Sequence, residues 1–369
     1  MDEFYTDEFY MRRALELAEK GRGYTNPNPM VGAVIVKDNR IIGEGYHHRY
    51  GDLHAERDAI KNCTESTENA TIYVTLEPCC HQGKQPPCTE AVLEAGIKRV
   101  VIGSMDPNPL VAGKGIDFLK ENGVTVEGPV LNKECLELNR VFFSYIKNKK
   151  PYVIMKYAQT LDGKIATYKG LSQWITDEEA REKVHEDRHK FASIMVGAGT
   201  VIKDNPTLTC RSTKISNPNN PIRIICDTNL RTPYDCNLIK TIDKAKLIIA
   251  TCSDDIEKIG HYEKLGCMVI KVPKDNNGHV DLKILVQELG RQGIDSIIAE
   301  GGGELNWSLL QAGLVNRVQV YIGSKIFGGE NAKTAVEGKG VDTPADAIII
   351  KNKEIHLLGN DILIEGDVE

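Results

Sequence analysis

The chain has 369 residues, of which 41% are hydrophobic and 27% are charged, and its formal net charge is −6. This balance is typical of a folded globular protein, and the length is sufficient for two domains that each bury a core. The negative charge argues against a protein that binds long nucleic acid through its phosphates.

No apolar run reaches the roughly 20 residues needed to cross a bilayer, and the longest, such as 30–36, has the length of a strand. The first residues, MDEFYTDEFYMRR, are acidic and aromatic, unlike a secretory signal. Ten cysteines without such a signal indicate a reducing compartment, in which thiols stay free or bind metal. We therefore expect a cytoplasmic protein with neither a membrane nor a nucleic-acid partner.

The first third of the chain alternates helix and strand patterns. A helix is predicted around 11–18, ending before Gly21, and others over 53–62, 89–95 and 115–122. Strands are predicted over 31–36, 40–45, 71–76 and 98–103. A longer helix follows over 132–147, with Cys135, Leu138 and Phe142 on one face. Strands separated by helices imply a mostly parallel or mixed sheet that is covered on both faces.

The polar stretch 147–151, which is closed by a proline, is the predicted boundary between domains 1–148 and 149–369. Beyond it, strands are predicted over 152–158, 193–196, 222–226, 247–250, 268–272 and 296–299, and helices near 255–264, 282–292 and 304–311. Thr176 and Glu179 suggest a capping box that opens a helix through His189. A hairpin is predicted over 347–365, with its turn at 359–361. Both domains are therefore expected to be α/β.

The pattern His54-Ala55-Glu56, followed by Pro78-Cys79 and Pro87-Cys88, predicts a catalytic zinc site. One imidazole and two thiolates provide three protein ligands and leave a fourth position for water. Glu56 can reach that water without ligating the metal and can carry its proton to a leaving nitrogen. This arrangement is the signature of zinc deaminases, except that eight residues, rather than two, separate Cys79 from Cys88.

Three alternatives remain open at this site. Cys80 could replace Cys79 as a ligand, although Cys79 directly follows the proline as the signature requires. His81 or Cys80 could supply a fourth ligand to a structural zinc ion. The histidine and cysteines could also be an ordinary helix residue and buried thiols.

Two strand–glycine–helix junctions, at 194–200 and 297–303, are the clearest signal in the second domain. Glycines there let a ligand approach the backbone, and the N–H groups at the start of a helix favour phosphate. Such junctions are common in α/β folds, so they are equally consistent with nucleotide binding and with ordinary turns.

Together these motifs resemble one known family, the bifunctional riboflavin-biosynthesis deaminase–reductases. The segments 28–34, 54–56, 75–79 and 106–109, together with the long insert before Cys88, are similar to its deaminase half. The segments 156–166, 172–176, 199–206 and 300–302 are similar to its reductase half. The resemblance implies a cytidine-deaminase-like three-layer domain followed by a dihydrofolate-reductase-like α/β domain.

The family's chemistry implies two reactions on small-molecule pyrimidine phosphoribosyl substrates. The first domain would use Zn2+ to deaminate 2,5-diamino-6-(5-phosphoribosylamino)pyrimidin-4-one hydrolytically. The second would use NADPH to reduce the ribosyl side chain to ribityl. The resemblance also implies a homo-oligomer.

In the first domain, the resemblance implies that His54, Cys79 and Cys88 hold zinc and that Glu56 is the proton shuttle. The positions that line the pyrimidine and phosphoribosyl site are Asn28, His47, His81, Lys84, Asp106 and Asn108. Amide and carboxylate groups can bind the edge of a heterocycle, and a lysine offers a point charge to phosphate. Otherwise, His47 and Lys84 would be surface residues, and Asn28 and Asn108 would be turn residues.

In the second domain, the positions that would contact NADPH are Ala158, Trp174, Thr200, Asp204, Thr228, Gly302 and Gly303. Those that would contact the substrate are Lys156, Ser172, Arg188, Leu208, Arg211 and Glu300, with Lys156 a candidate proton donor or orienting group. Arginine suits bidentate binding of phosphate. Without the resemblance, Arg188 would be an exposed member of a charged helix, Trp174 a core aromatic residue, and 204–206 a turn.

Two other functions are compatible with parts of the sequence. A nucleoside or tRNA-adenosine deaminase with an unrelated second domain would use the same zinc motif, but the net acidity and the long insert count against it. A binding protein with a structural metal, whose second domain senses a nucleotide, would not catalyse either reaction.

Overall fold

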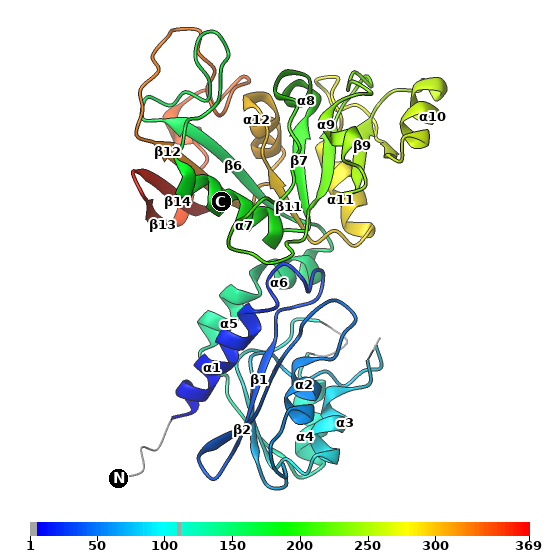
Figure 1. Ribbon diagram of the computed structural model, residues 1–369, viewed down its shortest axis with the longest axis vertical. Coiled ribbons are helices and arrows are strands. Elements are labelled where there is room, and N and C mark those ends of the chain that lie inside the picture. The colour runs from blue at the N-terminus through cyan, green and yellow to red at the C-terminus, as the bar shows by residue number, and fades with distance from the viewer. Residues whose placement is uncertain (1–5, 84, 109–111) are drawn as a thin grey trace. The chain divides into compact units, whose positions relative to one another are not determined.

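The computed structural model describes residues 6–83, 85–108 and 112–369, and the chain divides into two units, Met1–Lys149 and Lys150–Glu369 (Figure 1). Within the described residues, no helix combines the length and the apolar character needed to cross a membrane.

Unit 1 contains a five-stranded sheet in the order β2-β1-β3-β4-β5. Its strands are β1 (Gly32–Lys37), β2 (Arg40–Tyr46), β3 (Thr71–Val74), β4 (Arg99–Ile102) and β5 (Thr125–Glu127). Its helices are α1 (Asp7–Glu19), α2 (Ala55–Lys61), α3 (Cys88–Glu94), α4 (Lys114–Glu121), α5 (Asn132–Leu138) and α6 (Arg140–Asn148). Strands β3, β4 and β5 are parallel, whereas β1 runs antiparallel to β2 and β3.

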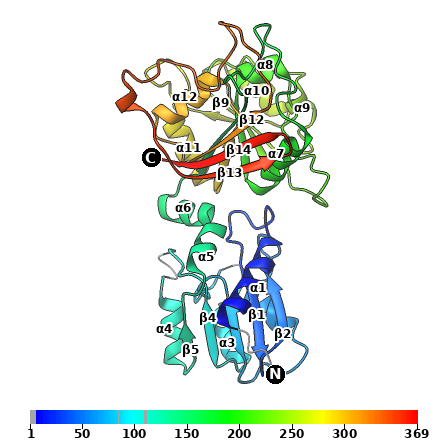
Figure 2. The ribbon, with the colours of Figure 1, turned by 90° about the vertical axis from the view of Figure 1, so that its left-hand side faces the viewer.

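The sheet of unit 1 is the middle of three layers (Figures 1 and 2). Ala33 and Ile35 of β1 pack in a core with α2, α3 and α4, while Val34 and Val36 pack in a second core with α1 and α5. Successive side chains of a strand point to opposite faces of the sheet. A strand whose residues are all apolar, such as β1, therefore contributes side chains to the cores on both faces. The three-layer arrangement predicted for the first domain is confirmed.

The single helix predicted over 132–147 is wrong, because the chain breaks at Asn139 into α5 and α6. The side chain of Asn139 bonds in both directions to the backbone of Met30: Met30 N–H donates to its Oδ1, and its Nδ2 donates to the Met30 carbonyl, each at 2.8 Å. Asn139 is buried and has non-helical backbone angles (φ −107°, ψ 20°). The two hydrogen bonds to Met30 hold Asn139 outside the helical conformation, so α5 ends there and α6 begins.

Unit 2 contains a nine-stranded sheet in the order β10-β9-β8-β7-β11-β6-β12-β14-β13. Its strands are β6 (Tyr152–Thr160), β7 (Ser193–Gly197), β8 (Ile222–Cys226), β9 (Leu247–Thr251), β10 (Met268–Lys271), β11 (Ser296–Ala299), β12 (Arg317–Gly323), β13 (Ile350–Leu358) and β14 (Asp361–Val368). Its helices are α7 (Glu178–Lys190), α8 (Ala198–Asp204), α9 (Asn237–Lys240), α10 (Ile256–Lys264), α11 (Leu282–Arg291) and α12 (Gly303–Gln311), together with the short 3-10 turn η1 (Pro344–Asp346). The pairs from β10 to β12 are parallel, and the C-terminal hairpin is antiparallel.

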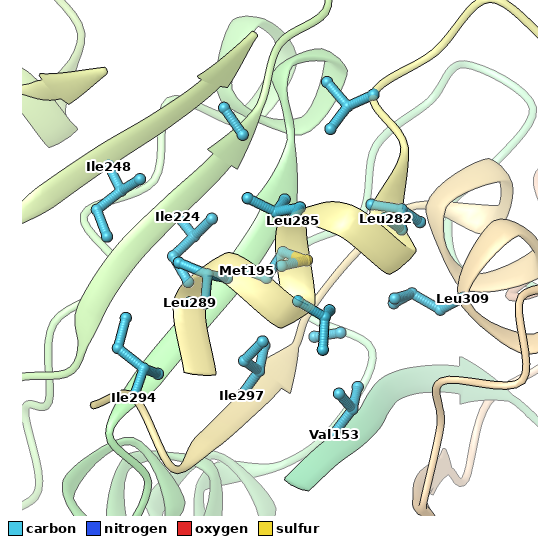
Figure 3. Packing of buried hydrophobic residues seen from close by; sticks show 14 of the residues in the cluster. Val153, Met195, Ile224, Ile248, Leu282, Leu285, Leu289, Ile294, Ile297 and Leu309 are labelled. Carbon is cyan, nitrogen blue, oxygen red and sulfur yellow. The ribbon is translucent and has the colours of Figure 1, made fainter. Parts of the chain in front are cut away.

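The main core of unit 2 lies between the sheet and helices α11 and α12 (Figure 3). Leu285 and Leu289 of α11 and Leu309 of α12 pack on Met195, Ile224 and Ile297 of the strands. The opposite face of the sheet carries α7, whose Ala180 packs with Tyr321 and Leu363. Lys156 therefore faces α7, because its neighbours Val153 and Met155 belong to the main core.

Of two local features predicted in unit 2, one is wrong and the other is confirmed. The Thr176–Glu179 capping box is wrong: α7 begins after Asp177, whose side chain makes no capping bond, and Thr176 is buried. The backbone N–H of Asp177 instead donates to Asp361 Oδ2 at 2.6 Å, which ties the start of α7 to β14. The predicted hairpin is confirmed, with Gly359 at φ 61° between β13 and β14.

Candidate functional site

The backbone brings His54, Cys79 and Cys88 together in unit 1. His54 is the residue before α2, Cys79 lies in the loop after β3, and Cys88 is the first residue of α3. One ligand atom from each lies within 4.8 Å of the others, and Cys80 and His81 lie outside this cluster of described residues. The backbone N–H groups of Cys88 and Thr89 donate to Sγ and the carbonyl of Cys79, at 3.5 and 3.2 Å, which holds the two cysteine segments side by side.

The donor atoms of this cluster fit one zinc ion. Zinc bonds of about 2.3 Å to sulfur and about 2.0 Å to nitrogen, at tetrahedral angles, separate the two donors by about 3.5 Å. Nδ1 of His54 lies 3.5 Å from Sγ of Cys79 and 3.3 Å from Sγ of Cys88. Hydrogen bonds from Cys88 and His54 lower the pKa of Cys79, which favours the thiolate, the form that binds metal.

Glu56 is a buried carboxyl group beside the cluster. It lies in the first turn of α2 and is only 4% exposed. Burial raises its pKa, and the Cys79 thiolate acts in the same direction. A carboxyl group in this setting can both accept and donate a proton.

Asn28 and His47 are linked to each other and to His54. Nδ1 of His47 lies 2.9 Å from the Leu53 carbonyl, so it carries the proton, and Nε2 accepts from Asn28 Nδ2 at 3.2 Å. The His47 ring is buried and meets the His54 ring edge-on at 5.5 Å. Burial lowers the pKa of His47, so the ring is a neutral, fixed hydrogen-bonding group rather than a surface residue.

The insert between the two cysteines is anchored at its C-terminal end. Arg57 of α2 donates from Nε and Nη2 to the carbonyls of Pro86 and Pro87, at 3.2 and 2.8 Å. Within the described residues, His81 Nδ1 is buried without a hydrogen-bond partner, so it is available to a ligand. Lys84 lies outside the described residues. The role of Arg57 was not predicted, because its partners are backbone carbonyls that no motif reveals.

Asp106 and Asn108 form a turn after β4. The Asn108 N–H donates to Asp106 Oδ1 at 2.8 Å, and burial raises the pKa of Asp106 to about 6. The sequence analysis did not assign a role to Glu77, which accepts from the N–H groups of Asp106, Gly113 and Gly115 at 3.0–3.3 Å. Its position directly before Pro78-Cys79 was the available signal. Glu77 holds this turn beside the loop that carries Cys79.

The predicted nucleotide positions of unit 2 gather along the carboxyl edge of adjacent parallel strands. Thr228 follows β8, Thr200 lies in α8 directly after β7, and Gly302 and Gly303 open α12 after β11. Ala158 lies near the end of β6 in the same sheet. A side chain added at Gly197, Gly199 or Gly302 would meet open space. This edge is where open α/β sheets bind their ligands.

Lys156, Arg188 and Glu300 form one charged cluster, whose side chains are largely buried (11–12% exposed). Both guanidinium nitrogens Nε and Nη2 of Arg188 bond the Glu300 carboxylate at 2.9 Å, and Lys156 Nζ lies 3.7 Å from Glu300 Oε2. Although burial favours the neutral acid, the Arg188 and Lys156 charges lower the pKa of Glu300 to about 2. Arg188 is thus a buried partner of Glu300, not the exposed helix residue that its own segment suggests.

Arg211 lies next to this cluster on the loop that follows α8. Its Nη1 donates to Thr207 Oγ1 at 2.6 Å, and its backbone N–H donates to His185 Nδ1 at 3.2 Å. Burial and the charges of Arg188 and Arg211 lower the pKa of His185 to about 4, so its ring is neutral. Leu208 is buried with φ at 54°, and the Arg188 Nη1 bond to the Thr209 carbonyl (3.3 Å) fixes the same loop.

Three further predicted residues lie on the surface of unit 2. Trp174 is 58% exposed rather than a core residue; the Arg181 guanidinium lies 4.7 Å from its ring, and Lys325 Nζ donates to its carbonyl. Ser172 is half-buried in the same segment, before α7. Asp204 is exposed at the end of α8.

Comparison with protein families matches both units. Residues 5–104 match the model of the cytidine and deoxycytidylate deaminase zinc-binding region, and residues 151–364 match the model of the RibD C-terminal domain. The first match contains His54, Glu56, Cys79 and Cys88.

Relatives and solved structures match over almost the whole chain. The riboflavin biosynthesis protein RibD of Actinobacillus pleuropneumoniae is 51% identical over 98% of this chain and 95% of its own length, and that of Escherichia coli is 39% identical over 97% and 98%. A RibD structure from Acinetobacter baumannii superposes with a TM-score of 0.88 at 33% identity, covering 98% of this chain and 99% of that one. The Thermotoga maritima diaminohydroxyphosphoribosylaminopyrimidine deaminase/5-amino-6-(5-phosphoribosylamino)uracil reductase has a TM-score of 0.85 at 39% identity, with the same coverage.

Proposed function

The chain belongs to the RibD family of bifunctional riboflavin-biosynthesis deaminase–reductases, and we propose that residues 1–148 perform its deamination and residues 149–369 its reduction. It is an enzyme with a zinc-binding deaminase domain and a reductase domain that uses NADPH. Its substrates are 2,5-diamino-6-(5-phosphoribosylamino)pyrimidin-4-one and the deaminated product of the first reaction. The observation that carries the proposal is the convergence of two thiols and an imidazole beside buried Glu56.

In the deaminase domain, His54, Cys79 and Cys88 would hold the zinc ion, which when bound would lower the pKa of its water enough to provide a nucleophile near neutral pH. Glu56 accepts a proton from the attacking water and delivers it to the leaving amino nitrogen, which departs as ammonia. The raised pKa of Glu56 favours this exchange, because a weakly acidic carboxyl group gains and loses a proton readily.

The remaining deaminase positions bind and orient the pyrimidine phosphate. Asn28 and neutral His47 present an amide and an imidazole fixed beside His54. Nδ1 of His81, which is buried without a hydrogen-bond partner among the described residues, suits a substrate oxygen or nitrogen, and Asp106 and Asn108 complete the set of substrate contacts. Lys84 supplies a positive charge for the phosphate group.

In the reductase domain, the carboxyl edge of the sheet holds NADPH, which supplies the hydride when bound. The open space at Gly302 and the N–H groups at the start of α12 suit its phosphates, with Gly303 in the same turn and Thr200 and Thr228 after the neighbouring strands. Asp204, at the end of α8, is assigned to the cofactor by resemblance. Ala158 and Trp174 complete this set.

Replacement of Gly302 by valine should weaken NADPH binding without unfolding the protein. Gly302 has φ −75°, which any residue adopts, and its Cβ would project into open space rather than into protein atoms. The added side chain would occupy the space needed for the nucleotide, so we expect roughly a tenfold or greater loss of affinity in a fluorescence titration. Gly260→Val in α10, which also faces open space, is the control and should bind NADPH normally. Unchanged affinity in Gly302→Val would contradict the assignment.

The substrate side of the reductase uses the buried cluster and the adjacent loop. Arg188 and Arg211 provide guanidinium groups for the phosphate, while Glu300, Ser172 and Leu208 line the ribosyl chain. Lys156 is the proton donor or orienting group, since it is the amine nearest Glu300 in the described cluster.

Changing Arg211 to methionine should weaken reduction and spare deamination. The guanidinium is exposed and is oriented by Thr207, so its loss removes a bidentate contact to phosphate rather than a packing element. We expect the KM for the reductase substrate to rise roughly tenfold or more, since a charge-assisted hydrogen bond is worth about 1.5–3 kcal/mol. NADPH oxidation and ammonia release are measured separately, with Arg291→Met as the surface control. Equal KM values for wild type and Arg211→Met would refute this role.

The protein is also proposed to form a homo-oligomer in the cytoplasm. Ile355 and Leu357 of the edge strand β13 are 68% and 77% exposed, which favours burial against another subunit. All ten cysteines are free thiols, in keeping with a reducing compartment. Light scattering on the purified protein tests the oligomeric state.

One experiment tests the whole proposal. The purified protein is incubated with the diaminopyrimidine phosphate, and zinc content, ammonia release and NADPH oxidation are followed in parallel. Zinc-dependent ammonia release followed by NADPH oxidation supports it. Deamination of a nucleoside or tRNA instead, with none of the pyrimidine phosphate, would reject it.

A further inference from the structure

A row of polar side chains that are buried or largely buried crosses the α7 face of the unit 2 sheet. Glu365 of β14, Gln319 of β12 and Lys156 of β6 are register neighbours on adjacent strands. Gln319 is 3% exposed, and its Nε2 donates to Glu365 Oε1 at 2.9 Å. Within the described residues, Gln319 Oε1 is buried without a hydrogen-bond partner. Buried polar groups are costly unless they are paired, so the presence of this row beside Lys156 calls for an explanation.

Asp187 of α7 accepts hydrogen bonds from the side chains of this face of the sheet. It is 1% exposed, and its Oδ2 accepts from Gln319 Nε2 at 3.1 Å and from the Tyr321 hydroxyl at 3.4 Å. Its Oδ1 accepts from Lys183 Nζ at 2.6 Å. Asp187 directly precedes Arg188 in the chain. One turn of α7 therefore places a carboxylate against the row and a guanidinium against Glu300.

Tyr321 connects Asp187 to Lys156. The Lys156 ammonium lies 5.4 Å from the centroid of the Tyr321 ring, within the range of a cation–π contact. Tyr321 is 1% exposed, and its hydroxyl is anchored at Asp187. The amine is therefore held between an aromatic face and the Glu300 carboxylate, 3.7 Å away.

We propose that Tyr321, anchored through its hydroxyl to Asp187, is a positioning residue that fixes the Lys156 ammonium against Glu300 in the reductase site. The inference rests on the proposed role of Lys156 in reduction. A lysine has four rotatable bonds, and a group that acts on substrate must be held in one geometry by its neighbours. Tyr321 contacts Lys156 through its ring face, so the ring can act on reduction through the amine.

The first test separates the ring from its hydroxyl. Tyr321→Leu removes the ring and should lower the kcat of reduction roughly ten- to thirtyfold. This is the fold-change that corresponds to the free energy of a cation–π contact shielded from water. Tyr321→Phe keeps the ring but frees it from Asp187, and a loss of about threefold is expected. The KM for NADPH should stay within about twofold in both, since neither group lies at the carboxyl-edge glycines. Tyr157→Phe, a tyrosine that packs on the opposite face, is the matched control.

The second test is the pH profile of reduction in Asp187→Asn. Lys156 is faced by Glu300 after β11, by Arg188 and Asp187 on α7, and by Tyr321 on β12. Burial lowers the pKa of Lys156, and the Asp187 charge opposes this shift. Loss of that charge should let the amine lose its proton at lower pH, so the alkaline limb of kcat moves to lower pH. If Asp187 served only core packing, this limb would stay in place; the Tyr321 variants test the ring itself.

Lys156→Met distinguishes the inference from the function on which it rests. If Lys156→Met reduces substrate at the wild-type rate, Lys156 has no role and the inference falls with it. If Lys156→Met is inactive while the Tyr321 and Asp187 variants keep the wild-type kcat and pH profile, the role of Lys156 stands and positioning by Tyr321 is wrong. NADPH affinity, measured by fluorescence, reports folding of unit 2; if Tyr321→Leu does not fold, Tyr321→Phe and Asp187→Asn decide the question.

Discussion

Replacing Glu56 with glutamine is expected to abolish ammonia release while zinc binding and NADPH-dependent reduction persist. Glutamine has the shape of glutamate but cannot take up and release the proton that the deamination requires. Glu56 is almost completely buried, so bulk water has little access to replace it as the shuttle. A general acid–base group contributes roughly 100- to 10,000-fold to a rate, and Glu56 is proposed to act on both the attacking water and the leaving nitrogen. The loss should therefore reach the upper part of this range.

The measurement pairs a direct assay of ammonia with the zinc content of each preparation. Glu90→Gln is a matched control, because this exposed glutamate lies in the first turn of α3, two residues after Cys88. It should retain full deaminase activity and full zinc. Wild-type ammonia release by Glu56→Gln would show that another group moves the proton, and loss of zinc would show that Glu56 supports the metal site instead.

The deaminase centre could be predicted from the sequence because its signals are local. Each Pro-Cys pair combines a ligand with a residue that fixes the backbone before it, and His54 and Glu56 are two positions apart at a helix start. The strands of unit 1 are short apolar runs closed by turn residues, so most boundaries agree within two residues. The spacing of the two cysteines differs from that of the usual signature. The longer insert nevertheless leaves Cys79 and Cys88 close to His54.

Features that depend on distant contacts could not be predicted in this way. The break at Asn139 is set by Met30, more than a hundred positions earlier, and the start of α7 is set by Asp361. The sequence around Arg188 is that of a charged surface helix; only the pairing with Glu300, 112 positions away, shows that this guanidinium is buried. Tyr321 was missed for the same reason, because β12 was not predicted at all.

The two halves also differ in how much their motifs say about chemistry. Metal ligands have demanding geometry, so a few residue types at fixed positions are specific. In a reductase the cofactor supplies the hydride. The protein needs only a surface that binds the cofactor, a cation that binds the substrate phosphate and an oriented proton donor. Glycine junctions and single arginines are common, which is why unit 2 was interpreted through resemblance. Its buried charge cluster is the feature that the structure adds.

Replacing Glu300 with alanine should abolish reduction and strongly destabilise unit 2. The carboxylate is the anion between Lys156 and the bidentate Arg188, so its removal leaves two buried cations facing each other. Breaking a buried pair costs about 3–5 kcal/mol, whereas an exposed pair is worth about 0–1 kcal/mol. Glu288→Ala in α11, which breaks a surface pair with Arg291, is the control and should change the unfolding free energy by less than about 1 kcal/mol.

The pH dependence of unfolding gives an independent measurement of the same cluster. The pKa of Glu300 is lowered to about 2 in the folded protein, from 4.5 for the free side chain. Its stabilising contribution is therefore complete above pH 4.5 and is lost as the pH falls towards 2. Denaturant unfolding of the wild type should show this loss, and Glu300→Gln should lack that component, because its side chain does not titrate. If Glu300→Ala unfolds at the wild-type denaturant concentration and reduces substrate normally, the cluster is neither a stabilising nor a functional centre.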